Sequence, residues 1–315
     1  MNLLLATYRN KWEKDILRSF YYLINILTKK YGYVLIDLSD YCLGSKFTDV
    51  LKDYQNVKNV LVIENHNEIL IHDIFTDFYD NKIRKYLFAD DVHKCREKKN
   101  QNYYEHFDKL FVTYYEPFLS MYPHIDKSKV IWCQHAYTND YLINFNDNPQ
   151  PKILLSGAIG TAYPFRKYML KLQRSECKNQ INYLKHPGYK LFDYDDGINK
   201  VGKNYATMLN SYLCCFTDCL VHGYIVSKYY EIPATGSLLL AQDPPGDKLE
   251  KIGFMDGINY IKCDMNNAKE KINWILDSKN RTKVDDIRRK GMELVRYNHS
   301  IEKRADVIVQ NINKN

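Results

Sequence analysis

The 315-residue chain lacks the features of several common protein classes. No apolar run approaches the ~20 residues that a membrane-spanning helix needs. The apolar start Leu3–Ala6 gives way at once to polar and charged residues, unlike a signal peptide. No two of the eight cysteines have the Cys-x-x-Cys spacing of a zinc ribbon. The sequence therefore predicts a reduced, cytoplasmic protein with no transmembrane segment.

Two fingerprints of nucleotide-binding proteins are also missing. The chain contains neither the Gly-x-Gly-x-x-Gly of dinucleotide-binding folds nor the Gly-x4-Gly-Lys-Ser/Thr of P-loops. The second absence argues against a P-loop nucleotidase.

The composition is that of a globular protein. Hydrophobic residues make up 45% and charged residues 26% of the chain, and its length favours two domains. The formal charge of +7 suits an anionic ligand, a nucleic acid or an anionic membrane surface. Because the charges of both signs are interspersed, we interpret them as a solvated surface and expect no nucleic-acid partner.

Short apolar runs alternate with longer amphipathic runs along the whole chain. Strands are predicted in the first half at Leu3–Ala6, Tyr33–Leu38, Val60–Ile63, Tyr86–Phe88, Leu110–Thr113 and Val130–Cys133. Strands are predicted in the second half at Ile153–Ser156, Asn182–Leu184, Leu213–Phe216, Leu238–Ala241 and Asn259–Ile261. Strands alternating with helices predict parallel sheets, with sites at the carboxyl ends of the strands.

The polar stretch Asn144–Pro151 separates the two halves. It contains two prolines and no apolar period, which is typical of a linker. Two consecutive doubly wound domains predict a cleft between them, a favoured place for a ligand. The pattern alone leaves a dehydrogenase, an epimerase, a binding protein and a glycosyltransferase open.

Candidate phosphate-binding residues follow strands of the second half. Gly157 and Gly160 lie between a strand and a helix, where free N–H groups can bind a diphosphate, although a plain tight turn explains them equally well. Arg166, at the start of that helix, can bind a phosphate bidentately or be solvated. Lys185 and His186 follow the next strand, where a cation and an imidazole can face a ligand or support a turn.

Two further candidates carry carboxylates. Glu231 lies on a short, mostly apolar helix, and a buried carboxylate needs a partner such as the two hydroxyls of a ribose. The plainer explanation is that Glu231 lies on a solvent-exposed face of the helix. In the first half, Asp91 and His93 follow a strand, where they can act as a general base or bind a sugar. Adjacent Asp residues also commonly cap helices.

The second half resembles a known family over about residues 150–310. The resemblance is carried by Tyr230-Glu231 and Gly236 before the strand Leu238–Leu240, by the turn Gly253–Gly257, by Asn259–Ile261, and by Arg288, Gly291 and His299. These features, in this order, resemble the group 1 type of GT-B glycosyltransferase, near the CgeB-like branch. The first half agrees in its order of strand, helix, strand and acid/His segment.

This resemblance implies two Rossmann-like doubly wound domains that face each other across a cleft. Residues 1–148 would form the acceptor domain, residues 149–298 the donor domain, and a helix in about residues 299–315 would return to the first domain. Glu231 would bind the ribose, Tyr189 would stack on the base, and Gly157 would lie beside the diphosphate. The other residues implied in donor binding are Arg166, Lys185, His186, Lys228 and Tyr229.

The expected function is hexosyl transfer from a UDP- or GDP-linked sugar to a glycan or glycoconjugate. The nucleotide sugar would be a co-substrate, and we expect no other cofactor. No Asp-x-Asp motif lies where a metal-dependent transferase would use one, so we expect no metal. An inverting enzyme would need a base such as Asp91 or His93, whereas a retaining enzyme would not.

One departure from the family keeps alternatives open. Many relatives have Glu-x7-Glu, but Gly223 occupies the first of these positions here. The alternatives are a nucleotide-sugar epimerase, a non-catalytic nucleotide- or sugar-binding protein and, because of the +7 charge, a nucleic-acid glucosyltransferase. The sequence leaves the donor sugar, the acceptor, the stereochemistry and the oligomeric state open.

Overall fold

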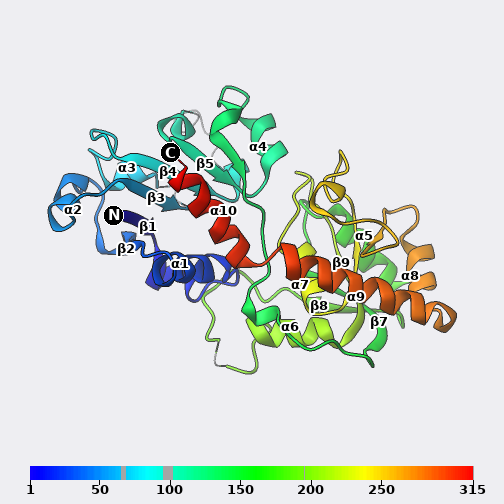
Figure 1. Ribbon diagram of the computed structural model, residues 1–315. Helices are drawn as coiled ribbons and strands as arrows, with labels where there is room; N and C mark the ends of the chain where they lie inside the picture. Colours follow the sequence, from blue (N-terminus) through cyan, green and yellow to red (C-terminus); the bar gives the residue numbers. More distant parts are fainter. Residues whose placement is uncertain (65–68, 95–101, 195, 315) are drawn as a thin grey trace. The chain divides into compact units, whose positions relative to one another are not determined.

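The computed structural model describes residues 1–64, 69–94, 102–194 and 196–314. The chain divides into two compact units (Figure 1). The first consists of Met1–Gln134 together with Glu302–Asn315, and the second of His135–Ile301.

The first unit is built on a six-stranded parallel sheet. In spatial order its strands are β2 (Val34–Asp37), β1 (Asn2–Ala6), β3 (Asn59–Ile63), β4 (Arg84–Ala89), β5 (Lys109–Val112) and β6 (Val130–Trp132). The interiors of the four central strands, β1, β3, β4 and β5, are buried throughout, as in Leu3–Leu5 of β1. Parallel strands covered on both faces read as continuous apolar runs, which is why the sequence pattern predicts them.

Helices and short turns connect these strands. The helices are α1 (Ser19–Lys29), α2 (Phe47–Asp53), α3 (Ile71–Ile74), α4 (Tyr115–Met121) and α10 (Ile301–Asn313). Short turns lie at η2 (Leu38–Asp40), η3 (Val92–Lys94), η5 (Tyr103–His106) and η6 (Lys127–Lys129), and a π-helical turn at η1 (Tyr8–Trp12). α1 buries Phe20, Leu23, Ile24 and Leu27, the face that its spacing predicts.

The last helix, α10, belongs to the first unit. Its Asp306 accepts a hydrogen bond from the Tyr31 hydroxyl, and Nζ of Lys30 lies 3.3 Å from the same carboxylate. Nε of Arg304 donates to the carbonyl of Gln134 at 2.9 Å. The first unit is therefore completed by a helix from the far end of the chain.

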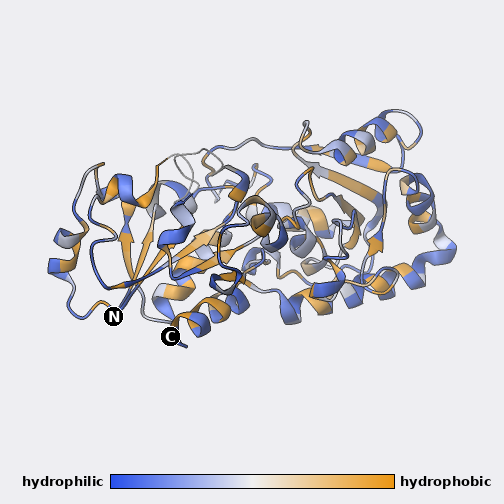
Figure 2. Ribbon diagram, turned by 90° about the horizontal axis from the view of Figure 1, so that it is seen from above, coloured by the Kyte–Doolittle hydropathy of each residue, from blue (hydrophilic) through white to orange (hydrophobic). Residues whose placement is uncertain are grey.

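The second unit contains a five-stranded parallel sheet. In spatial order its strands are β11 (Ile261–Lys262), β10 (Leu238–Ala241), β9 (Tyr212–Thr217), β7 (Gln150–Gly157) and β8 (Ile181–Lys185). Its helices are α5 (Pro164–Arg174), α6 (Gly202–Asn210), α7 (Lys228–Ala234), α8 (Ala268–Leu276) and α9 (Arg281–Asn298), with short turns at η7 (Asn139–Tyr141), η8 (Glu250–Ile252) and η9 (Ser278–Asn280). In Figure 2 the strands are mostly hydrophobic. The helices have one hydrophobic and one hydrophilic side, as expected for helices that cover a sheet.

Every strand that the sequence predicts is present, and most of their ends are displaced by a few residues. At the last strand the structure has only Ile261–Lys262 in place of the predicted Asn259–Ile261. The side chain of Asn259 instead accepts from the N–H of Met255 and donates to the carbonyl of Gly253, so it stabilises the preceding turn.

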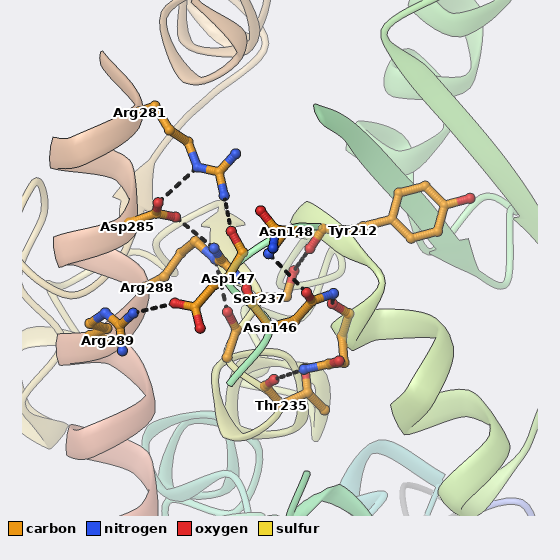
Figure 3. Close-up of polar contacts among 12 residues, drawn as sticks. Asn146, Asp147, Asn148, Tyr212, Thr235, Ser237, Arg281, Asp285, Arg288 and Arg289 are labelled. Atoms are coloured by element: carbon orange, nitrogen blue, oxygen red, sulfur yellow. Dashed lines mark hydrogen bonds and ion pairs between the residues drawn. The ribbon is translucent and has the colours of Figure 1, made fainter. Parts of the chain in front are cut away.

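The polar stretch predicted as a linker packs within the second unit (Figure 3). Arg288 of α9, which is fully buried, donates to the carbonyl of Asn146 at 2.8 Å. Arg281 donates to the carbonyl of Asp147 at 2.7 Å, and Arg289 lies 2.6 Å from the Asp147 carboxylate. The chain passes from the first unit to the second at Gln134, upstream of this stretch.

Candidate functional site

Two cationic side chains converge on the carboxyl end of β7. Gly157, the last residue of β7, has a φ of +108°, and a Cβ atom there would lie 2.5 Å from Nζ of Lys228 and 2.8 Å from Nη1 of Arg166. Glycine is the residue that both adopts this backbone conformation and leaves room for the two cations.

The Gly157→Ala variant should therefore lose more stability than backbone strain alone explains. A strained backbone costs about 1–3 kcal/mol, and here the methyl group would also displace Lys228 and Arg166. Gly246→Ala is the matched control, because Gly246 has a φ of +90° with nothing within 4 Å of an added Cβ. Urea denaturation of both variants measures the difference, and equal losses would contradict the crowding at Gly157.

Arg166 is fixed by a buried carboxylate. Asp218, directly after β9, lies with Oδ1 2.7 Å from Nε of Arg166 and accepts from the Arg166 N–H through Oδ2 at 3.0 Å. The Arg166 guanidinium also lies 4.0 Å from the ring centroid of Tyr163. Burial raises the pKa of Asp218 although the charge of Arg166 opposes this. The guanidinium is thus held in one orientation at the strand end.

Lys228 is the first residue of α7. Its Nζ donates to Oγ of Ser156 at 3.1 Å, and the Tyr205 hydroxyl lies 2.7 Å from the same oxygen. Burial lowers the pKa of Lys228 well below the usual range, the charge of Arg166 lowers it further, and the charge of Glu231 opposes both. A lysine in this environment gains from an incoming anion, which would favour its charged form.

Glu231 lies one turn further along α7. Its side chain is largely buried beside the side chains of Tyr141 and Ser227. Burial raises the pKa of Glu231, and the nearby Lys228 charge opposes this effect. Residues three apart on a helix share a face, so α7 presents one cation and one carboxylate together.

The loop after β8 adds an imidazole and an exposed ring. Nδ1 of His186 accepts from the N–H of Gly188 at 3.0 Å, and burial together with the charges of Lys228 and Arg166 lowers the pKa of His186. A neutral imidazole with Nδ1 occupied carries its proton on Nε2. The Tyr189 ring lies 4.8 Å from the His186 ring and is 77% exposed.

Two other predicted donor residues lie beside this group: Lys185 pairs with Gly157 in the sheet, and Tyr229 directly follows Lys228 on α7. Lys185, the last residue of β8, is exposed to solvent. Tyr229 is fully buried, and its hydroxyl donates to the carbonyl of Gln242 at 2.5 Å, which ties α7 to the end of β10. Its contact supports the helix that bears Lys228 and Glu231.

Several residues around the site were not identified from the sequence. Asp218 follows a predicted strand. The expectation that sites lie at the carboxyl ends of strands, which singled out Gly157, would therefore also have found Asp218. Ser156 precedes Gly157 within the same strand. Tyr141 and Tyr205 reach the site from η7 and α6, and no local pattern indicates their position.

Asp91 and His93 lie in the first unit, directly after β4, and both are half-buried. Asp91 is at the centre of a three-residue turn in which the N–H of Val92 donates to the carbonyl of Asp90. Among the described residues, no group of three or more His, Cys, Asp or Glu side chains could hold a metal ion. In the same part of the chain, no helix is long and apolar enough to cross a membrane.

The sequence matches no protein-family model and no curated protein. Solved structures that are similar over the whole chain include the glycosyltransferase from Rickettsia africae ESF-5, at 11% identity over 99% of this chain and 98% of that one, with a TM-score of 0.62. Alr3699/HepE of Anabaena, in complex with UDP and glucose, is 6% identical over 100% of both chains, with a TM-score of 0.64. An alpha-glucosyltransferase in complex with UDP and DNA containing a HMU base is 11% identical over 99% of both chains, with a TM-score of 0.62.

At these identities the likeness concerns the fold. It does not address the narrower resemblance to the CgeB-like branch, which stays a prediction. Two parallel α/β units in one chain, and neighbours that cover all of it, confirm the fold that the sequence predicted: the chain has the fold of the GT-B glycosyltransferases.

Proposed function

We propose that the protein is a glycosyltransferase that moves a hexose from a nucleoside-diphosphate sugar to a hydroxyl of a glycan or glycoconjugate. The observation that carries the proposal is the convergence of Arg166 and Lys228 on Gly157, with the Glu231 carboxylate on the same face of α7. A buried lysine with a lowered pKa beside a fixed guanidinium suits a diphosphate. The carboxylate nearby suits the two hydroxyls of a ribose.

The leaving group would be stabilised by these cations. As the bond to the sugar breaks, negative charge develops on the departing diphosphate, and preorganised positive groups at that point supply a large part of catalysis. Lys228 and Arg166 would take this role in the absence of a metal, and we propose that the reaction needs neither a metal nor a cofactor. The Nε2–H of His186 and the charge of Lys185 would assist.

The nucleoside would lie against the other predicted residues. Glu231 would bind the ribose, and the exposed Tyr189 ring would stack on the base. We favour UDP as the nucleotide because Alr3699/HepE, which has the same fold, was solved with UDP and glucose. Tyr229 would act indirectly, through its contact with Gln242.

The acceptor would meet Asp91 or His93 of the first unit. One of them would remove the proton of the acceptor hydroxyl if the reaction inverts the sugar. The fold does not separate classes of acceptor, since an alpha-glucosyltransferase with DNA shares it. We favour a glycan or glycoconjugate in the cytoplasm over a nucleic acid as the acceptor. The positive charges of this chain are interspersed with negative ones and form no basic run that would suit a nucleic acid. Nothing favours the epimerase alternative over transfer.

Thermal unfolding with a panel of nucleotides and nucleotide sugars tests the donor site. A ligand at about 100 times its Kd should add about 2.7 kcal/mol to the free energy of unfolding. We expect one nucleoside diphosphate to raise the Tm of the wild type and to have no effect on Glu231→Ala. Glu270→Ala, which removes an exposed glutamate of the same unit, should respond like the wild type.

The result also separates the alternatives. A wild type that none of the nucleotides stabilises would contradict the proposed donor site. A wild type that binds a nucleotide sugar but never releases the nucleoside diphosphate would instead indicate the non-catalytic binding protein.

A further inference from the structure

The backbone on both sides of Asp91 is held by side chains from distant parts of the first unit. The N–H of Asp90 donates to Oε1 of Glu64, and the Tyr122 hydroxyl donates to the carbonyl of Val92 at 2.7 Å. Between these two attachments Asp91 forms the centre of the three-residue turn. The segment that carries Asp91 and His93 is therefore fixed from two directions.

Glu64 adopts a backbone conformation that residues other than glycine rarely take. It follows β3 with a φ of 54°, in the left-handed region. Its N–H donates to the carbonyl of Phe88 at 2.9 Å, which brings it beside the end of β4. Such a conformation is strained for a residue that has a Cβ atom, and it often marks a functional position. A glycine would avoid this strain, so the contact of the Glu64 side chain with Asp90 explains why a glutamate is here.

Tyr122 holds the other side of the turn. It is 2% exposed, and its ring packs against Tyr104 at 4.7 Å and Phe118 at 5.1 Å between ring centroids. These contacts fix the hydroxyl, and a hydrogen bond in such a dry environment is stronger than one in water. Removing only this oxygen would free the carbonyl of Val92 while leaving the aromatic packing intact.

We propose that Glu64 and Tyr122 are positioning residues that hold Asp91 and His93 in the geometry the reaction needs. Glu64 acts through Asp90 and Tyr122 acts through Val92, so neither has to touch a substrate. The inference rests on the proposed function, in which Asp91 or His93 meets the acceptor. A displacement of about 1 Å at a reacting group can lower the rate about 100-fold.

The test measures UDP release from UDP-glucose by the full chain, with water in place of the acceptor. Glu64→Gly removes the carboxylate and relieves the left-handed backbone, so this variant should fold. Tyr122→Phe removes one hydroxyl. We expect both to lower kcat about 10- to 100-fold with the KM for UDP-glucose unchanged. Glu64→Gln keeps an acceptor oxygen for the Asp90 N–H and should recover most of kcat.

A matched control lies in the second unit. Asp247 also has a left-handed φ, of 48°, and its side chain is 76% exposed. Asp247→Gly should leave kcat and KM unchanged, which excludes a general effect of relieving such a residue. A merely structural role of Glu64 would lower the Tm of Glu64→Gln and Glu64→Gly and leave the kcat of both equal to that of the wild type.

The outcomes distinguish this inference from the proposed function. If the wild type releases UDP and both Glu64→Gly and Tyr122→Phe do so at the same rate, only the positioning role is wrong. If Glu64→Gln loses as much kcat as Glu64→Gly, the charge of Glu64 acts directly and positioning is again wrong. A wild type that binds nucleotides without releasing UDP removes the catalytic role of Asp91 and His93, and this inference with it.

Discussion

Replacing Lys228 by methionine should lower kcat for sugar transfer by about 100- to 1,000-fold, the loss typical of removing one preorganised group that stabilises transition-state charge. Arg166 already shares its charge with Asp218 at 2.7 Å, so Lys228 brings the additional positive charge to the end of β7. Methionine keeps much of the length of lysine without its charge. Steady-state kinetics with the nucleotide sugar chosen by thermal unfolding measures the loss.

The same lysine should make nucleotide binding depend on pH. A bound diphosphate favours the charged form of Lys228 and raises its pKa, so binding takes up a proton where the free side chain is partly neutral. Affinity should therefore fall as the pH rises through the pKa of the free protein. Without ligand, the stability of the fold changes with pH in the direction opposite to the affinity. The unfolded chain binds a proton that the folded chain does not, so the contribution of Lys228 to stability rises from the folded pKa up to that of an ordinary lysine.

Calorimetric titration with the nucleotide, in buffers of different ionisation enthalpy, measures the number of protons taken up on binding. The uptake should vanish in Lys228→Met and persist in Lys171→Met, which removes an exposed lysine of α5. Unchanged uptake in Lys228→Met would show that another group titrates with the ligand.

Asp218→Ala should lower the free energy of unfolding by about 3–5 kcal/mol, because it leaves the buried guanidinium of Arg166 without its partner. Both side chains of this pair are almost fully buried, at 4% and 1% exposure. The variant should also lose nucleotide binding, because Asp218 sets the orientation of Arg166. Urea denaturation and the nucleotide panel measure the two effects separately.

An exposed ion pair supplies the comparison for Asp218→Ala. Asp286 lies 2.7 Å from Lys290 on α9 with about half of each side chain exposed, and such pairs contribute about 0–1 kcal/mol. Asp286→Ala should therefore leave the midpoint nearly unchanged. Adding Arg166→Met to Asp218→Ala should restore part of the lost stability, since the uncompensated charge is then gone. A loss below about 1 kcal/mol for Asp218→Ala would contradict the buried pair.

The sequence predicted the sheets well because burial on both faces gives parallel strands an unmistakable composition. Leu238–Ala241, for example, is predicted and observed with the same ends. The strand-end rule then singled out Gly157 and His186, which the structure brings near the same two cations. These inferences use information that lies within a few residues of each position.

The residues that sequence reasoning missed depend on packing between distant segments. Tyr141 reaches Glu231 from η7, and Tyr205 reaches Ser156 from α6, so neither has a local signal. The polar stretch around Asn146 resembled a linker because it contains two prolines and no apolar period. Its carbonyl is instead bound by Arg288, 142 positions further along the chain.

The place of α10 has a consequence for the order in which the protein is completed during translation. Residues 135–301 emerge from the ribosome before Glu302–Asn315, and the latter belong to the first unit. The second unit therefore has all of its residues first, although the chain begins with the other one. Until Asp306 can reach Tyr31, and Arg304 can reach Gln134, the nascent first unit exposes the surface that α10 covers. A premature stop at position 302 would thus leave the second unit whole and damage the amino-terminal unit, which is made first and completed last.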